Sequence, residues 1–162
     1  EFLDILARSR ERKKIKCTLL VEGEGPLRSE VLESIDNLKL GEVVVCTGTM
    51  DLSLFFRSIG ILCVPSRFNE DFPNISLEAA SLGIPSIVSS YGGLYEQSRL
   101  LDGIFAYDPN SADGFVKALE AAEQFKNDVD RRLSLMNKVR KHFDVSNRIK
   151  KLNKLVSTLN EY

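Results

Sequence analysis

The chain has 162 residues and a formal net charge of −1 at pH 7, with 43% apolar and 28% charged residues. This length fits one domain with a sizeable core, and no apolar run approaches the roughly 20 residues that a membrane helix needs. The charge is uneven, because residues 138–154 carry a net +6 and leave −7 on the rest. A body with that charge is a poor general surface for nucleic acid, so we expect no nucleic-acid partner.

In chain order, helical patterns alternate with short apolar runs. Residues 1–12 have the pattern of a helix, and apolar runs predict strands at 16–21, 43–47, 61–65, 86–89 and 103–107. Amphipathic stretches between them predict helices at 27–36, 51–58 and 75–82. Strands that are apolar throughout are typical of a parallel sheet covered on both faces. The pattern therefore predicts a Rossmann-like α/β fold, a parallel sheet flanked by helices, and a strand that precedes the first helix.

After the fifth strand the pattern is helical to the end. Ser111 is placed to cap a first helix, and Leu133 marks the apolar stripe of a second. A third helix carries an apolar stripe formed by Ile149, Leu152, Val156 and Leu159. No linker divides the chain, so we expect residues 1–162 to form a single domain with these C-terminal helices.

Cys17, Cys46 and Cys63 each lie in an apolar run, and their spacing matches no metal motif. We expect them to be small core residues in a reducing compartment. His142 lies on the basic helix, where a surface role is expected. No grouping of Ser, His and an acid indicates a hydrolase.

The most informative stretch runs from Pro65 to Gly93. A strand ends at Pro65, a loop follows, and a helix is predicted to start near Asn74 as its N-cap. The carboxyl end of a parallel strand is where open α/β sheets bind ligands. The amides of Asn74, Ile75 and Ser76 at the helix start would form an anion site suited to a diphosphate.

Two acids accompany this helix start. Glu78 lies about one turn into the helix, and its side chain leans back toward the crevice, where a carboxylate can accept two hydrogen bonds from a ribose. Glu70, in the loop, can accept from sugar hydroxyls. Two glutamates eight positions apart also occur by chance, so the pair alone does not identify a site.

The pattern is longer than this pair. It comprises Pro65-Ser66, Glu70, Glu78-Ala79, Gly83-Ile84-Pro85 and Gly92-Gly93-Leu94-Tyr95-Glu96, preceded by Gly23-Glu24-Gly25-Pro26 and Thr47-Gly48-Thr49-Met50. In order and spacing it resembles the family 4 glycosyltransferases, a large retaining group with the GT-B fold, over roughly residues 15–160.

The resemblance implies roles for individual residues. Glu78 would bind the ribose of the donor and Glu70 the transferred sugar, which makes these two the candidate catalytic residues. The donor-binding residues that it implies are Phe72, Pro73, Asn74, Ile75 and Ser76 beside the sugar and diphosphate, Thr49 and Met50 against the base, and the glycines Gly23, Gly25, Gly92 and Gly93. The alternative is that the glycines only form tight turns. Pro73 replaces a frequent glycine and removes one N–H.

The resemblance further implies that the chain is the C-terminal, donor-binding half of a GT-B enzyme that transfers a sugar from a nucleotide-diphospho-sugar to a glycan or lipid-linked acceptor. No metal or other cofactor is expected. The family's Arg and Lys that contact the diphosphate would lie upstream of the first helix, before Glu1, and so would the N-terminal acceptor domain, so we expect the chain alone to be inactive. The resemblance suggests polysaccharide biosynthesis in the cytoplasm, with possible peripheral contact at the inner membrane face. The alternative is a non-catalytic nucleotide- or protein-binding module of the same fold.

Overall fold

A computed structural model describes residues 1–12, 17–143, 146, 149–150, 153 and 156–157. The helices are α1 (Phe2–Arg12), α2 (Arg28–Asn37), α3 (Leu52–Ser58), α4 (Asn74–Ser81), α5 (Gly92–Leu100), α6 (Ala112–Lys126) and α7 (Val129–Phe143). The strands are β1 (Leu19–Glu22), β2 (Val44–Gly48), β3 (Leu62–Val64), β4 (Ser86–Ser89) and β5 (Ile104–Tyr107). Each predicted strand and each helix predicted within the described residues is present, with ends shifted by a few residues.

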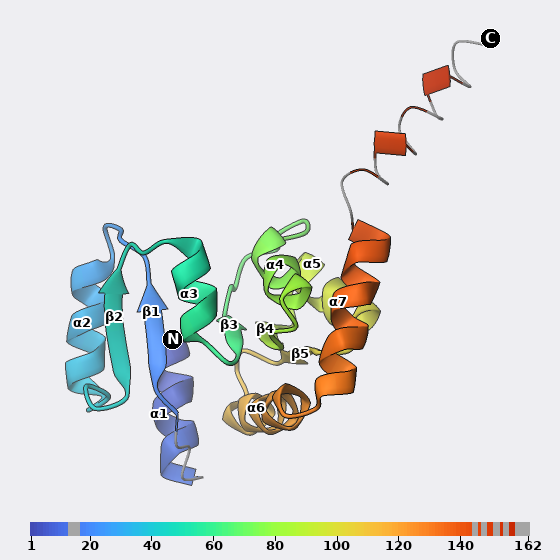
Figure 1. Ribbon diagram of the computed structural model, residues 1–162. Coiled ribbons are helices and arrows are strands. Elements are labelled where there is room, and N and C mark those ends of the chain that lie inside the picture. The colour runs from blue at the N-terminus through green and yellow to red at the C-terminus, as the bar shows by residue number, and fades with distance from the viewer. Residues whose placement is uncertain (13–16, 144–145, 147–148, 151–152, 154–155, 158–162) are drawn as a thin grey trace.

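The strands are all parallel, as predicted, but they form two sheets. One sheet has the order β1-β2 and the other β3-β4-β5. Figure 1 shows the two-stranded sheet at one side of the molecule, with β3, β4 and β5 at the other side. The predicted α/β fold with parallel strands flanked by helices is confirmed, and the strands form two sheets because β1 and β3 are not paired.

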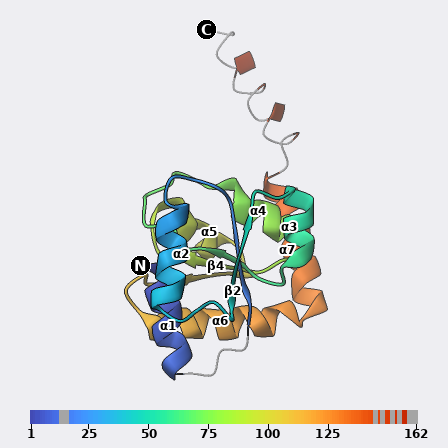
Figure 2. The ribbon, with the colours of Figure 1, turned by 90° about the vertical axis from the view of Figure 1, so that its left-hand side faces the viewer.

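One hydrophobic core joins the two sheets. It contains Ile5 and Leu6 from α1, Val44 from β2, Ile87 from β4 and Phe115 from α6. Helix α1 lies against α6 (Figure 2), and the ring of Phe2 meets that of Phe115 edge-on at a centroid distance of 5.5 Å. Burial of these side chains therefore binds the two sheets into one unit through the helices rather than through strand pairing.

The sequence predicted one helix cap correctly and missed one helix. Ser111 caps α6 as predicted, because its Oγ accepts a hydrogen bond from the Gly114 N–H at 2.9 Å. Helix α5 was not predicted, since two consecutive glycines indicated a turn. It begins at Gly92, whose φ of +47° is open to glycine at little steric cost, and carries the inward-facing residues Leu94 and Gln97.

The expectation that the three cysteines lie in the core is wrong for Cys17, which is exposed, while Cys46 and Cys63 are partly buried. The third predicted C-terminal helix lies largely outside the described residues. Of its apolar stripe, only Ile149 and Val156 are described, and both are exposed. No helix in the described part of the chain has the length and hydropathy of a membrane span.

Candidate functional site

The loop that follows β3 leads into α4 at the carboxyl end of the three-stranded sheet. Pro73 occupies the N-cap position with φ −66° and ψ 136°, and Asn74 is the first helical residue. The prediction of Asn74 as the N-cap is therefore wrong by one position, because the extended backbone of Pro73 stops the helix there. The first helical amides are those of Asn74, Ile75 and Ser76, which have no carbonyl partner within their own helix.

A buried glutamine holds this helix start. Gln97, on α5, is fully buried, and its Nε2 donates to the carbonyl oxygen of Pro73 at 2.8 Å. The hydroxyl of Ser76 donates to Gln97 Oε1 and lies 3.3 Å from the same carbonyl. Since no described peptide bond is cis, the Asn74 N–H points away from the Pro73 carbonyl. Gln97 thus turns that carbonyl inward and the first amide of α4 outward.

Two glycines bring α5 into backbone contact with the loop that carries Glu70. The Gly93 N–H donates to the Glu70 carbonyl at 2.8 Å. A Cβ added at Gly92 would lie 2.7 Å from that oxygen, and one added at Gly93 would lie 2.0 Å from the Asp71 carbonyl oxygen. Both positions therefore require glycine because the loop backbone approaches them closely. The alternative, that these glycines only form a tight turn, does not explain this contact.

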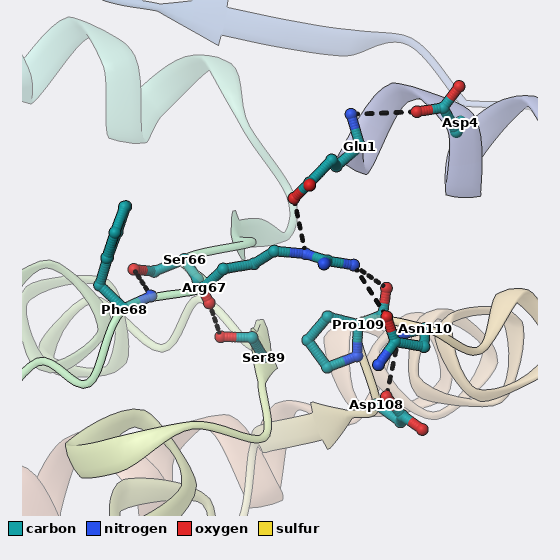
Figure 3. A network of polar contacts seen from close by, with 9 residues as sticks. All are labelled: Glu1, Asp4, Ser66, Arg67, Phe68, Ser89, Asp108, Pro109 and Asn110. Carbon is teal, nitrogen blue, oxygen red and sulfur yellow. Dashed lines mark hydrogen bonds and ion pairs between the residues drawn. The ribbon is translucent and has the colours of Figure 1, made fainter.

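Arg67 ties the same loop to the loop after β5 (Figure 3). Its Nη2 donates to the Pro109 carbonyl at 2.9 Å and to Asn110 Oδ1 at 3.1 Å, and its Nε lies 3.0 Å from Glu1 Oε2. Ser89, at the end of β4, donates to the carbonyl of the residue before Arg67. These contacts hold the loop after β3 against three other segments of the chain.

The second group of predicted residues lies at the carboxyl end of the β1-β2 sheet. The Gly23 N–H donates to the Gly48 carbonyl at 3.0 Å, and the Met50 N–H donates to Glu22 Oε1 at 3.3 Å. The loop after β1 and the turn containing Thr49 and Met50 are therefore in contact. Gly23 has a φ of +121°, which glycine tolerates best, whereas nothing in the structure requires glycine at position 25.

The predicted residues thus form two groups, each at the carboxyl end of one sheet. Glu70 and Glu78 are both exposed, and Phe72 is partly buried against α7, where its ring stacks on Phe143. A cavity of about 580 Å³ reaches between the sheets and contacts Glu22 and Ile75. Among the predicted residues, Ile75 is the one that lines it, so the prediction that both groups face one cleft stays a prediction.

Two titrating groups on the three-stranded sheet, Cys63 and Tyr107, are neutral at pH 7. Burial raises the pKa of the Cys63 thiol to about 12, reinforced by Cys17. Burial also raises the pKa of Tyr107 well above its usual value. Within the described residues, no three His, Cys, Asp or Glu side chains are grouped as a metal site would require.

Sequence reasoning missed Gln97 and Arg67. A signal for Gln97 existed, because a polar residue three positions after Leu94 lies on the same face of a helix and needs a partner when that face is buried. This signal could not be used, because α5 was not predicted from the sequence. Arg67 gave no signal, since its partners at residues 109 and 110 lie more than forty positions away.

Comparison with known proteins is consistent with this architecture. The sequence matches the family described as glycosyl transferases group 1 over residues 1–124. An uncharacterized glycosyltransferase of Methanocaldococcus jannaschii is 31% identical over 96 residues, which cover 57% of this chain and 24% of that protein.

Similar solved structures include a glycosyltransferase from Rickettsia africae, with a TM-score of 0.78 and 19% identity over 93% of this chain and 42% of that one. Sucrose-phosphate synthase from Thermosynechococcus elongatus has a TM-score of 0.74 and 20% identity, covering 98% of this chain and 42% of that chain. HepE from Anabaena in complex with UDP has a TM-score of 0.75 and 17% identity, covering 96% and 44%. These identities show a shared fold, and this chain spans less than half of each protein. Because the family match covers most of this chain, residues 1–124, the chain belongs to the group 1 glycosyl transferases.

Proposed function

We propose that this chain is the donor-binding half of a retaining glycosyltransferase of family 4, a hexosyltransferase type with the GT-B fold. The observation that carries the proposal is the start of α4. Its first amide points outward from the end of β3, held by the buried Gln97 contact with Pro73. A helix start with free amides is suited to the diphosphate of a nucleotide-sugar. The solved structures of HepE with UDP and with UDP-glucose support a donor of this class for the fold.

Within this proposal the two exposed glutamates take the roles implied by the family pattern. Glu78 accepts hydrogen bonds from the ribose, and Glu70 contacts the transferred sugar from the loop clamped by Gly93. Thr49 and Met50 meet the base through main chain. The Glu22 contact with the Met50 amide supports that turn. The donor then lies across the carboxyl ends of both sheets.

We further propose that the acceptor, a glycan or a lipid-linked sugar, binds to another domain of the parent enzyme and that no metal takes part. Transfer requires both substrates to be held together in a water-poor cleft. We therefore expect no transfer by this chain alone. A cytoplasmic enzyme with peripheral contact at the inner membrane face is the setting that we propose, through the basic stretch 138–154, which lies partly outside the described residues.

Titration of the chain with UDP and GDP, followed by amide chemical shifts, tests the donor site. We expect millimolar affinity, with the largest shifts at Asn74, Ile75 and Ser76. Glu78→Ala should weaken binding by about tenfold or more, because a hydrogen bond to a charged group contributes about 1.5–3 kcal/mol. Glu42→Ala, at the opposite end of β2, is the matched control and should have no effect. Nucleotide binding that Glu78→Ala leaves unchanged would contradict the assignment.

A further inference from the structure

β5 is the last strand of its sheet, and its outer edge is open. In the described part of the chain β5 pairs with β4 on one side, and no strand lies on its other side. Residues 104–108 all line an open groove of about 460 Å³ that follows this edge. Phe105 and Ala106 are only partly buried, whereas every residue of β4 is buried. The backbone of β5 is therefore accessible along the groove.

Ala106 directs its backbone groups into this groove. The carbonyls of Gly103 and Tyr107 accept hydrogen bonds from the N–H groups that follow the ends of β4, so both face β4. Successive residues of a strand direct their N–H and C=O groups to opposite edges. Ala106 and Asp108 therefore direct theirs away from β4. An accessible row of such groups is a template for pairing with another strand.

The helices beside the groove have the spacing that a second, symmetry-related sheet would need. Figure 1 shows α5 above and α6 below the three-stranded sheet, and each helix contacts both β4 and β5. A two-fold copy joined through β5 would place each equivalent helix two strand spacings away, at about 10 Å. Packed helices have interaxial distances of about 8–10 Å, so contact would form on both faces. On α5, Ser98 lines the groove, and Tyr95, one turn earlier on the same side, is 44% exposed and available for that contact.

The flank of α6 along the groove permits a close approach. Gly114, Lys117 and Ala118 line the groove, and Ala121 continues the same helix face one turn later. Three of these four side chains are no larger than a methyl group, and Lys117 is exposed. A second helix can therefore lie against this flank without displacing large side chains.

The level of α6 beside β5 determines what a two-fold axis would bring together. A Cβ added at Gly114 would lie 3.8 Å from the nitrogen of Asp108, so these two residues are level, and α6 returns along β5 from there. The strand covers about 6.6 Å from Asp108 to Ala106, which is the length of about four helical residues. Ala118 is therefore level with Ala106.

We propose that β5 pairs antiparallel with β5 of a second copy of this chain, about a two-fold axis at Ala106. Each Ala106 N–H then donates to the Ala106 carbonyl of the other copy, and the two three-stranded sheets become one. Such an isologous contact closes after two copies. The proposal goes beyond the proposed donor site and does not depend on it.

The charges on α6 favour a second copy as the occupant of this edge. Lys117 lies one residue before Ala118 and Glu120 two residues after it, and both side chains are exposed. An axis level with Ala118 therefore sets Lys117 of one copy opposite Glu120 of the other, and this pair occurs twice. The complementarity lies within a single helix face, so it needs no partner other than the same chain.

Light scattering of the chain over about 1–200 µM is the first test, and the share of dimer should rise with concentration. Lys117→Glu and Glu120→Lys each place like charges across the axis and should weaken dimerisation by about tenfold, because the contact occurs twice. The double variant exchanges the two charges and should restore the affinity, while Glu33→Lys, an exposed charge reversal on α2, should have no effect. A chain that stays monomeric, or a double variant that dimerises no better than the single variants, would overturn the proposal.

Amide hydrogen exchange tests which surface is used. The Ala106 amide should exchange about tenfold more slowly in the dimer than in the monomer, whereas Phe105, whose N–H faces β4, should be equally protected in both. Ala106→Pro removes the outward donor at an edge position where proline is tolerated, and should abolish the dimer. A dimer in which the Ala106 amide gains no protection uses another surface, and the proposal then fails. A chain that stays monomeric, but whose Ala106 amide is protected by a peptide of residues 103–108, would assign the edge to extended peptides instead.

Discussion

Replacing Gly93 by alanine perturbs the contact between α5 and the loop that carries Glu70. The added Cβ would lie 2.0 Å from the Asp71 carbonyl oxygen, whereas real Cβ atoms essentially never approach closer than 3.0 Å. The loop must therefore move by about 1 Å or more. Because the obstacle is backbone rather than a flexible side chain, it cannot turn aside by changing a rotamer.

Two opposing effects set the size of the change. Overpacking of this kind costs about 3 kcal/mol, the upper part of its usual range. Alanine is favoured over glycine inside a helix by about 1 kcal/mol, which offsets part of that cost. The net loss is about 2 kcal/mol of unfolding free energy, or a melting temperature lower by about 4–8 °C for a chain of this size.

Thermal and urea unfolding measure this difference directly. The matched control is Gly25→Ala, because an added Cβ there meets nothing within 4 Å and its φ is not in the left-handed region. It should change the unfolding free energy by less than about 0.5 kcal/mol. If Gly93→Ala and Gly25→Ala melt within a degree of each other, the close approach of α5 to the loop does not exist in solution and the reasoning fails.

Three further predictions concern single side chains. Gln97→Leu removes the buried hydrogen bonds to the start of α4, so it should destabilise the chain by about 2–3 kcal/mol and move the amide resonance of Asn74. Gln97→Glu keeps an acceptor for the Ser76 hydroxyl but has no N–H for the Pro73 carbonyl and buries a carboxylate, so it should also destabilise the chain. An unchanged Asn74 amide shift in Gln97→Leu would count against the positioning role. The Asp51 side chain accepts from the Ser53 hydroxyl and the first α3 amides, which lowers its pKa. That stabilisation should be present above pH 3.8 and be lost as the pH falls through the lowered pKa. Asp51→Asn should therefore make the unfolding free energy less dependent on pH in this range. The same pH dependence below pH 3.8 in the mutant and in the original chain would exclude the effect. A thiol reagent at pH 8 should modify the exposed Cys17 before Cys63, which is partly buried and whose pKa is raised by desolvation to about 12; reaction of both at the same rate would contradict this difference in accessibility.

The helices and strands were largely predictable because their patterns are local. An apolar run such as 86–89 or an apolar stripe such as that of α6 depends on residues a few positions apart, and the Ser111 cap depends on a contact three positions away. The order of the glycosyltransferase motif is equally a property of the chain. The exception was α5, where two glycines indicated a turn and instead begin a helix pressed against another loop.

The sequence by itself therefore determined the α/β class, the parallel direction of the strands and the family to which the chain belongs. Only the tertiary structure decided which strands pair, that β1 and β3 are not paired, and that Gln97 and Gly93 hold the start of α4 and the Glu70 loop. The physical reason is separation along the chain. Gln97 meets Pro73 across 24 positions and Arg67 meets Pro109 across 42, and such contacts depend on how helices and sheets pack rather than on any periodic pattern.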